Sequence, residues 1–179
     1  MDLIRQGIEN GCSDLALQAT GEPFFDKRLA RFVEEASRLD YPYIWLATNG
    51  ALATPKRAQP VLDAGLTSIK FSINAANKEE YQRVHGHDDF DKVIENLHWI
   101  YDYRNANKLN LGIYVSCVSN SQMIDETLPD LIEPYCDHFM SYRTISNQGG
   151  NMMELNDTEE IETSNILGSL NSDEITGKC

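Results

Sequence analysis

The chain has 179 residues, of which 41% are hydrophobic, so it is long enough to bury the core of one ordinary globular domain. Its 28 acidic residues outnumber its 15 basic residues, and the net charge of -13 argues against long nucleic acids as partners. No apolar run is long enough to cross a bilayer, and the first residues, MDLIRQGIENGC, lack the apolar segment of a secretion signal. We therefore expect a cytoplasmic protein with no membrane partner.

The negative charge is concentrated near the C-terminal end. Residues 151–179 contain seven acidic residues and one basic residue, a net charge of -6. Charge runs of this kind are usually solvated. We therefore expect residues 1–147 to form the folded core and residues 148–179 to form an acidic linker.

The four cysteines are widely separated along the chain. Cys12, Cys117, Cys136 and Cys179 show no C-x-x-C spacing, which argues against a zinc knuckle or a disulfide framework. Cys117 lies in an apolar run and Cys136 follows a helical segment, as expected of small buried hydrophobic residues.

The first elements in chain order are two strands that each lead into a helix. Residues 14–19 form a short apolar run, and a helix with Asp26 as its cap follows. Residues 41–51 form the second strand. A short helix then begins at Pro55, after Thr54 as cap, and ends before Gly65.

The remaining elements repeat this order. Residues 68–74 form a strand, and the Asn77 cap with Glu80 three residues later predicts a helix that breaks at Gly86. A longer helix starts after Asp88 and Asp89. The last predicted elements are a strand at 110–120, a helix at 122–133 and a strand at 138–146.

This alternation indicates an α/β protein with parallel strands, either a doubly wound sheet or a β/α barrel. In the run SIKFSIN, Ile69, Phe71 and Ile73 can face helices while Lys70, Ser72 and Asn74 face the other side. A strand covered on both faces would be apolar throughout, so the pattern favours a barrel with a polar cavity. A strand at the edge of a sheet, with its polar face in solvent, would give the same alternation.

The predicted strands end in small polar residues, where ligands bind in parallel β/α folds. These ends are ATGEP at 19–23, ATNG at 47–50, SINA at 72–75, CVSN at 117–120 and TISN at 144–147. Turns recruit the same residue types. Glu22 stands out, because Asp26 can already cap the next helix and the turn does not require a second carboxylate.

Three segments in consistent order resemble the radical S-adenosylmethionine (SAM) superfamily, in particular the branch that carries a C-terminal SPASM domain. They are LQATGEPFFD, LATNGAL and IKFSINAANKEEYQRVHG, within a match that runs from Leu3 to Ser146. The resemblance implies a partial (β/α)6 barrel that lacks its first strand. It also implies that residues 148–179 lead toward a truncated SPASM-like region.

The resemblance also implies site residues. The segment formed by Thr20, Gly21, Glu22 and Pro23 would receive hydrogen bonds from the ammonium group of SAM. Ser72 and Asn74 would reach the ribose or carboxylate of the cofactor, with Arg83 a further candidate for the carboxylate. The cavity would also be lined by Thr48 and Asn49. Val118 and Ser119 lie where the adenine binds in the family, but the expected glycine-rich pattern is absent, and Arg143 is compatible with either a site or a surface role.

In this family a [4Fe-4S] cluster held by a C-x-x-x-C-x-x-C motif reduces SAM to a 5′-deoxyadenosyl radical, which removes hydrogen from a peptide or a small molecule. An electron donor such as flavodoxin or ferredoxin would be a partner. The sequence contains no such triplet, and Cys179 falls where the first ligand of an auxiliary cluster is expected. A fragment of a longer enzyme, inactive by itself, is the simplest account of these departures.

Two alternatives remain open. The chain could be a cluster-free, degenerate β/α barrel that acts as a binding module, although residues 14–19 would then form an edge without protective Pro or Lys. It could also be a metal hydrolase centred on HGHDD, His85 to Asp89, although helix capping explains the Asp pair and no distant third ligand is identifiable.

Overall fold

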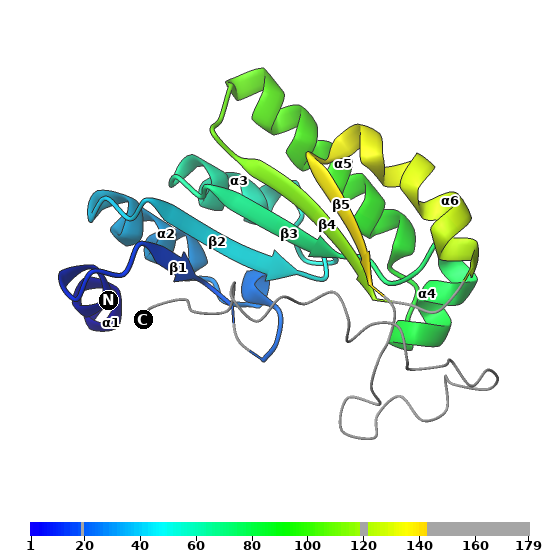
Figure 1. The fold of residues 1–179 in the computed structure, drawn as a ribbon, viewed down its shortest axis with the longest axis horizontal. Coiled ribbons are helices and arrows are strands. Elements are labelled where there is room, and N and C mark those ends of the chain that lie inside the picture. The colour runs from blue at the N-terminus through cyan, green and yellow to red at the C-terminus, as the bar shows by residue number, and fades with distance from the viewer. Residues whose placement is uncertain (19, 119–121, 143–179) are drawn as a thin grey trace, which may run out of the picture. The chain divides into compact units, whose positions relative to one another are not determined.

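The computed structural model describes residues 1–18, 20–118 and 122–142, with only the backbone of 122–125 (Figure 1). The described residues lie in one compact unit, Met1–Thr144. The predictions for Ser119, Arg143, the acidic segment and Cys179 fall outside the described residues. None of the described helices is long and apolar enough to span a membrane.

Five parallel strands form one sheet in the order β1-β2-β3-β4-β5. They are β1 (Asp14–Ala16), β2 (Tyr43–Thr48), β3 (Ser68–Ser72), β4 (Gly112–Val118) and β5 (His138–Tyr142). Each strand lies beside the next one in the sequence, so every crossover runs in the same direction. Right-handed crossovers that never reverse place their helices on one face of the sheet.

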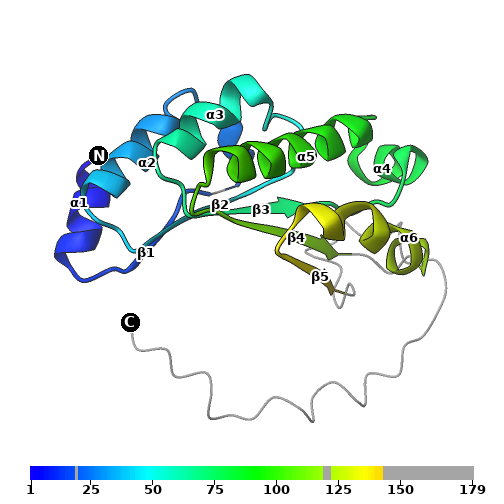
Figure 2. The same ribbon diagram turned by 90° about the horizontal axis from the view of Figure 1, so that it is seen from above.

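In the described residues one helix precedes β1, and five helices and two short 3-10 turns connect the strands. They are α1 (Asp2–Glu9), η1 (Pro23–Phe25), α2 (Leu29–Arg38), α3 (Pro55–Asp63), α4 (Lys78–His85), α5 (Phe90–Asn107), α6 (Gln122–Ile132) and η2 (Glu133–Tyr135). Figure 2 shows α2, α3 and α5 on the same side of the sheet. The α/β class and the parallel order are therefore confirmed, and a doubly wound sheet is excluded for the described strands. Within these strands the sheet is open, with β1 and β5 at its edges.

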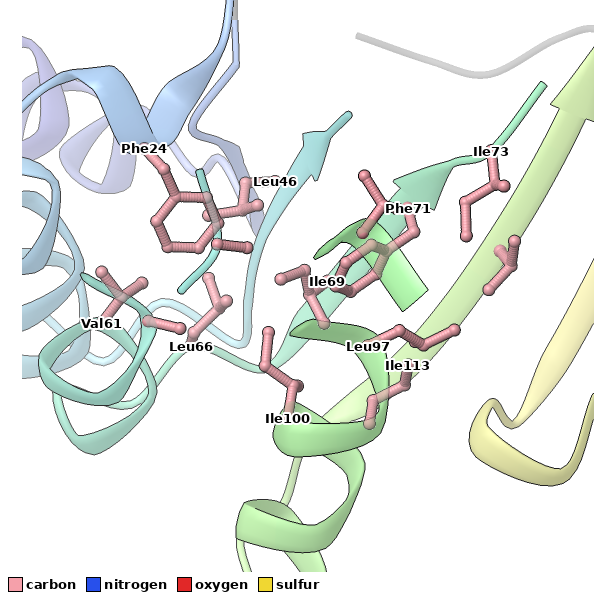
Figure 3. Packing of buried hydrophobic residues seen from close by; sticks show 14 of the residues in the cluster. Phe24, Leu46, Val61, Leu66, Ile69, Phe71, Ile73, Leu97, Ile100 and Ile113 are labelled. Atoms are coloured by element: carbon pink, nitrogen blue, oxygen red, sulfur yellow. The ribbon is translucent and has the colours of Figure 1, made fainter. Parts of the chain in front are cut away.

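The core fills the space between the sheet and these helices. Ile69 and Phe71 of β3 and Ile73, which directly follows the strand, are fully buried. From α5, Leu97 and Ile100 pack toward them (Figure 3). The prediction that the apolar residues of SIKFSIN face the helices is therefore confirmed. Lys70, Ser72 and Asn74 are half-buried and belong to the other half of the alternation.

Of two helix caps predicted from the sequence, Asn77 and Asp26, the first is confirmed and the second is not. The Asn77 cap is confirmed, because its Oδ1 accepts a hydrogen bond from the Glu80 amide at 2.9 Å, and Gly86 ends α4 with a φ of 76°. Asp26 does not cap α2 directly. It accepts a hydrogen bond from the Arg28 amide at 2.8 Å, and the helix begins one residue later at Leu29.

Candidate functional site

The carboxylate of Glu22 joins the loop after β1 to the end of β2. Thr48 donates its hydroxyl to Glu22 Oε1 at 2.7 Å, and the Asn49 amide donates to Glu22 Oε2 at 2.9 Å. The Phe24 amide donates to Oε1 at 3.1 Å. Because hydrogen bonds to a carboxylate are of the stronger, charge-assisted kind, Glu22 fixes the two strand ends relative to each other.

The view that the turn does not need Glu22 is therefore wrong. Glu22 is the N-cap residue of η1, and its side chain binds the Phe24 amide of that turn. Pro23 occupies the first position of the turn, where a missing amide hydrogen has no cost. The prediction failed because a 3-10 turn, with its own cap, intervenes between the strand and the helix that Asp26 precedes.

The network continues from Thr48 into the turn after β2. The Thr48 hydroxyl, which is buried, accepts a hydrogen bond from the Gly50 amide at 3.0 Å. The Gly50 carbonyl accepts a hydrogen bond at 2.8 Å from Nδ2 of Asn96, a buried residue of α5. Asn96 was not singled out from the sequence, since an amide inside an amphipathic helix gives no signal of its distant partner.

Gly50 is required for its conformation and for its lack of a side chain. Its φ is 81°, and a Cβ there would lie 2.8 Å from Phe71 and 2.9 Å from Val93. The ATNG turn is therefore packed against β3 and α5 with no room for a methyl group.

The backbone just before Glu22 is exposed. Thr20 and Gly21 are exposed, and Gly21 has a φ of 132°, a conformation that residues with a Cβ rarely adopt. On the other side of the turn, Arg57 donates to the Phe24 carbonyl at 2.7 Å and ties η1 to α3. An exposed, glycine-containing segment is thus held between two fixed points.

The ends of β3 and β4 carry the other predicted polar residues. Asn74 accepts a hydrogen bond from the Val118 amide through Oδ1 at 2.9 Å. Its Nδ2 has no hydrogen-bond acceptor among the described residues. Ser72 is half-buried and lies in register with Ser116 of β4. Hydroxyl and amide groups therefore occur together at this edge of the sheet.

Arg83 lies apart from these contacts. Its guanidinium is 3.6 Å from Glu80 within α4, and its side chain is 59% exposed. Glu80 is buried and accepts a hydrogen bond from the Ala76 amide at 2.9 Å, so it holds the loop between β3 and α4. The described contact of Arg83 is thus with Glu80 of its own helix, and not with the residues at the strand ends.

An aromatic cluster on α4 lies near the loop that contains Glu22. The Tyr81 side chain is buried, and burial raises its pKa, with further contributions from the negative charges of Asp89 and Glu22. The His85 ring lies 4.2 Å from the Tyr81 ring, between centroids, and burial lowers the pKa of His85. Its Nε2 is buried without a hydrogen-bond partner among the described residues.

The HGHDD segment does not assemble a metal site in the described part of the chain. His87 Nε2 lies 3.3 Å from Asp89, but no group of three or more His, Cys, Asp or Glu side chains there could hold a metal ion. The hydrolase alternative therefore gains no support.

The described cysteines do not fit a [4Fe-4S] cluster, which requires several thiolates in one place. Cys12 is exposed near the N-terminus, Cys117 is buried within β4, and Cys136 follows η2. They belong to no group of three potential ligands within the described residues. We therefore derive no step of a reaction through a cluster bound to these side chains.

Comparisons with known proteins bear on this geometry. A family model described as the Radical SAM superfamily matches residues 1–128 of the chain. The chain belongs to this superfamily. The match includes the Glu22 loop, the ATNG turn and the end of β3, so the family predicted from these segments is confirmed at the level of the superfamily.

The curated relatives are longer proteins, and each match covers only part of them. A GTP 3',8-cyclase of Aliarcobacter butzleri is 28% identical over 133 residues, which are 73% of this chain and 38% of that protein. A probable GTP 3',8-cyclase of Saccharolobus islandicus is 34% identical over 77 residues, 43% of this chain and 25% of that protein. An uncharacterized protein of Methanocaldococcus jannaschii is 24% identical over 151 residues, covering 80% of this chain and 50% of that protein. The chain spans half or less of each.

A solved structure shares the fold. The chain of SuiB from Streptococcus suis, in a crystal structure bound to S-adenosylmethionine, has a TM-score of 0.62 and 18% sequence identity. The similarity covers 80% of this chain and 33% of that chain. At this identity the likeness concerns the fold alone.

Proposed function

We propose that this chain forms the SAM-binding part of a radical SAM enzyme, with the cofactor at the carboxyl ends of β1, β2 and β3. The observation that carries the proposal is the junction at Glu22, where a side chain braces an exposed glycine segment against the end of the neighbouring strand. The family match over residues 1–128 supports it. Ligands of parallel β/α folds bind at this edge of the sheet.

In this proposal Glu22 is both a brace and a cofactor contact. A carboxylate offers about four acceptor positions, and three are used by Phe24, Thr48 and Asn49. Oε2 has accepted one of these bonds and retains room for one more. The cofactor ammonium would be held by this oxygen together with the backbone carbonyls of Thr20 and Gly21, which are exposed residues.

The other polar end groups complete the proposed site. Asn74 Nδ2 and the Ser72 hydroxyl would bind the ribose or carboxylate of the cofactor, and Asn49, which is exposed, would line the cavity. Arg83 stays a candidate for the carboxylate. Together these side chains would bind and orient SAM and limit the access of water.

When a reduced [4Fe-4S] cluster is also bound, SAM supplies the 5′-deoxyadenosyl radical that removes hydrogen from a substrate. We propose that thiolates other than those of the four cysteines of this chain hold the cluster and that flavodoxin or ferredoxin supplies the electron. The SPASM branch, with Cys179 as an auxiliary ligand, and a peptide or small-molecule substrate belong to the same proposal. The named relatives are GTP 3',8-cyclases, which makes a purine nucleotide the competing substrate class.

A cluster-free binding module is the second candidate, because the sequence lacks the cysteine triplet. Calorimetric titration with SAM tests what the two candidates share, and we expect saturable binding with one site per chain. If the protein with its cluster produces 5′-deoxyadenosine under anaerobic reducing conditions, it is the enzyme and not the binding module. Absence of SAM binding would refute both.

The SAM affinity of an Asn74→Ala variant tests whether the cofactor binds at the end of β3. The loss of an amide contact is expected to weaken SAM binding about tenfold. Asn107→Ala is the matched control, because the Asn107 side chain is exposed and its amide contacts the Tyr103 carbonyl of its own helix at 2.9 Å. Equal affinities in the two variants would place SAM away from the end of β3.

A further inference from the structure

Lys70 is a cation on the face of the sheet that the helices do not cover. It lies in the middle of β3, in register with Ala47 of β2 and Tyr114 of β4. It is half-buried, and it lines a groove of ≈ 620 Å³. Asp14, Trp45, Ser68 and Tyr114 are among the other residues that line the groove. A cavity of this size accommodates a small organic molecule.

Lys70 takes part in no ion pair or hydrogen bond within the described part of the chain. Other cations with a low exposed fraction are paired, as when Arg104, with 13% of its side chain exposed, contacts Asp137 at 2.6 Å. A lysine can rest its apolar stem on neighbouring side chains, but its ammonium seeks water or an anion. An unpaired lysine within a groove is therefore available to a ligand.

The only acidic residue lining the groove in the described structure is too far away to neutralise Lys70. Asp14 lies on β1, two strands away from β3. The register places it four residues closer than Lys70 to the N-terminal ends of the strands. At ordinary strand spacings the two Cα atoms are on the order of 15 Å apart. In a protein with a net charge of -13, the groove thus retains a local positive centre.

The surroundings of Lys70 specify more than charge. Trp45 of β2 is paired with Ser68, which lies two residues before Lys70 on the same face of β3. Tyr114 of β4 is paired with Lys70 itself. Both rings are half-buried and line the groove. Aromatic side chains beside a cation suit a ligand that has a planar ring and an anionic group.

We propose that Lys70 is a substrate-recognition residue that binds a phosphate group of a small molecule whose planar ring rests on Trp45 or Tyr114. A phosphate is favoured over a carboxylate because a lysine ammonium binds anions as a point charge, and a phosphate group carries more negative charge than a carboxylate. This inference rests on the proposed function. It places the substrate about 7 Å along β3 from Ser72, the residue proposed for SAM.

Calorimetric titration of the protein with two pairs of probes tests the inference. GTP and guanosine share a planar base and differ in the phosphates, while hippurate and hippuramide share a phenyl ring and differ in the carboxylate. We expect GTP to bind at least about tenfold more tightly than guanosine, and Lys70→Met to abolish that preference. Lys70→Arg should retain most of it, and Lys56→Met, on the exposed surface of α3, should leave it unchanged.

Several results would overturn the inference. They are equal binding of GTP and guanosine, no binding of either, a preference confined to hippurate, or an equal loss in Lys56→Met. Circular dichroism identifies folded variants, and Lys70→Gln replaces Lys70→Met if the latter does not fold. SAM titration separates the two proposals, because wild-type protein that fails to bind SAM refutes the proposed function. A Lys70→Met variant that alone loses SAM binding would instead make Lys70 a cofactor residue and refute its role in substrate recognition.

Discussion

The two faces of β3 differ although they come from the same few residues. Ile69 and Phe71 are fully buried against the helices, as is Ile73 directly after the strand, whereas Lys70 and Ser72 are half-buried on the other face. The first set makes the contacts that stabilise the fold. The second set carries a charge and a hydroxyl and packs under no helix of the described structure. In the proposals made above, ligand binding and stability therefore depend on alternate positions along one strand.

The largest expected effect comes from the covered face. Phe71→Ala should lower the free energy of unfolding by about 3–5 kcal/mol, because it removes a buried ring and leaves a cavity. Ser72→Ala, one position along on the other face, should change it by about 0.5 kcal/mol or less. Urea denaturation measures both variants, and similar losses would mean that the open face is also packed.

The next effect concerns the turn that joins the covered face to the proposed site. Gly50→Ala should destabilise the protein by about 2 kcal/mol or more, because a methyl group would overlap Phe71 and Val93 in addition to the cost of a positive φ. Gly86→Ala is the matched control. Gly86 also has a positive φ, but a methyl group there would meet no atom within 4 Å, so a loss of about 1 kcal/mol is expected. Equal losses by thermal denaturation would show that Gly50 is needed for its conformation alone.

Glu22→Gln should have a smaller effect on stability than Phe71→Ala or Gly50→Ala, a loss of about 1–2 kcal/mol. The glutamine amide keeps one acceptor oxygen, so the hydrogen bonds from Thr48 and Asn49 can no longer both be made at separate oxygens. Glu34→Gln, an exposed change on α2, should cost about 0.5 kcal/mol or less. A Glu22→Gln variant as stable as this control would show that the brace contributes nothing to the fold.

The sequence predicted much of this comparison. The period-2 alternation of SIKFSIN separated the two faces of β3, and the repeated order of strands and helices predicted the parallel sheet. Such patterns are local and survive folding. The start of β1 at Asp14 was predicted correctly, but its end was less readable. The strand ends at Ala16, although it was expected to continue to residue 19, and beyond it the Leu17 amide still donates to the Trp45 carbonyl of β2 at 2.8 Å.

The contacts of the site were less accessible to prediction. Glu22 was identified as unusual, but its partner Thr48 is 26 residues away and Asn96 lies 46 residues from Gly50. Side chains that meet across such separations are brought together by the fold and leave no spacing in the sequence. For the same reason the HGHDD segment resembled a metal site although its neighbours, Tyr81 and Phe90, are aromatic.

Hydrogen-deuterium exchange with and without SAM tests the central claim most directly, because it reports where on the protein the cofactor binds. We predict slower exchange in peptides that contain Thr20–Glu22, Thr48–Gly50 and Ser72–Asn74. Peptides from the exposed surface of α2 should exchange at the same rate in both conditions. Protection confined to other segments, or no protection at a concentration of SAM that saturates calorimetric binding, would contradict the proposed site.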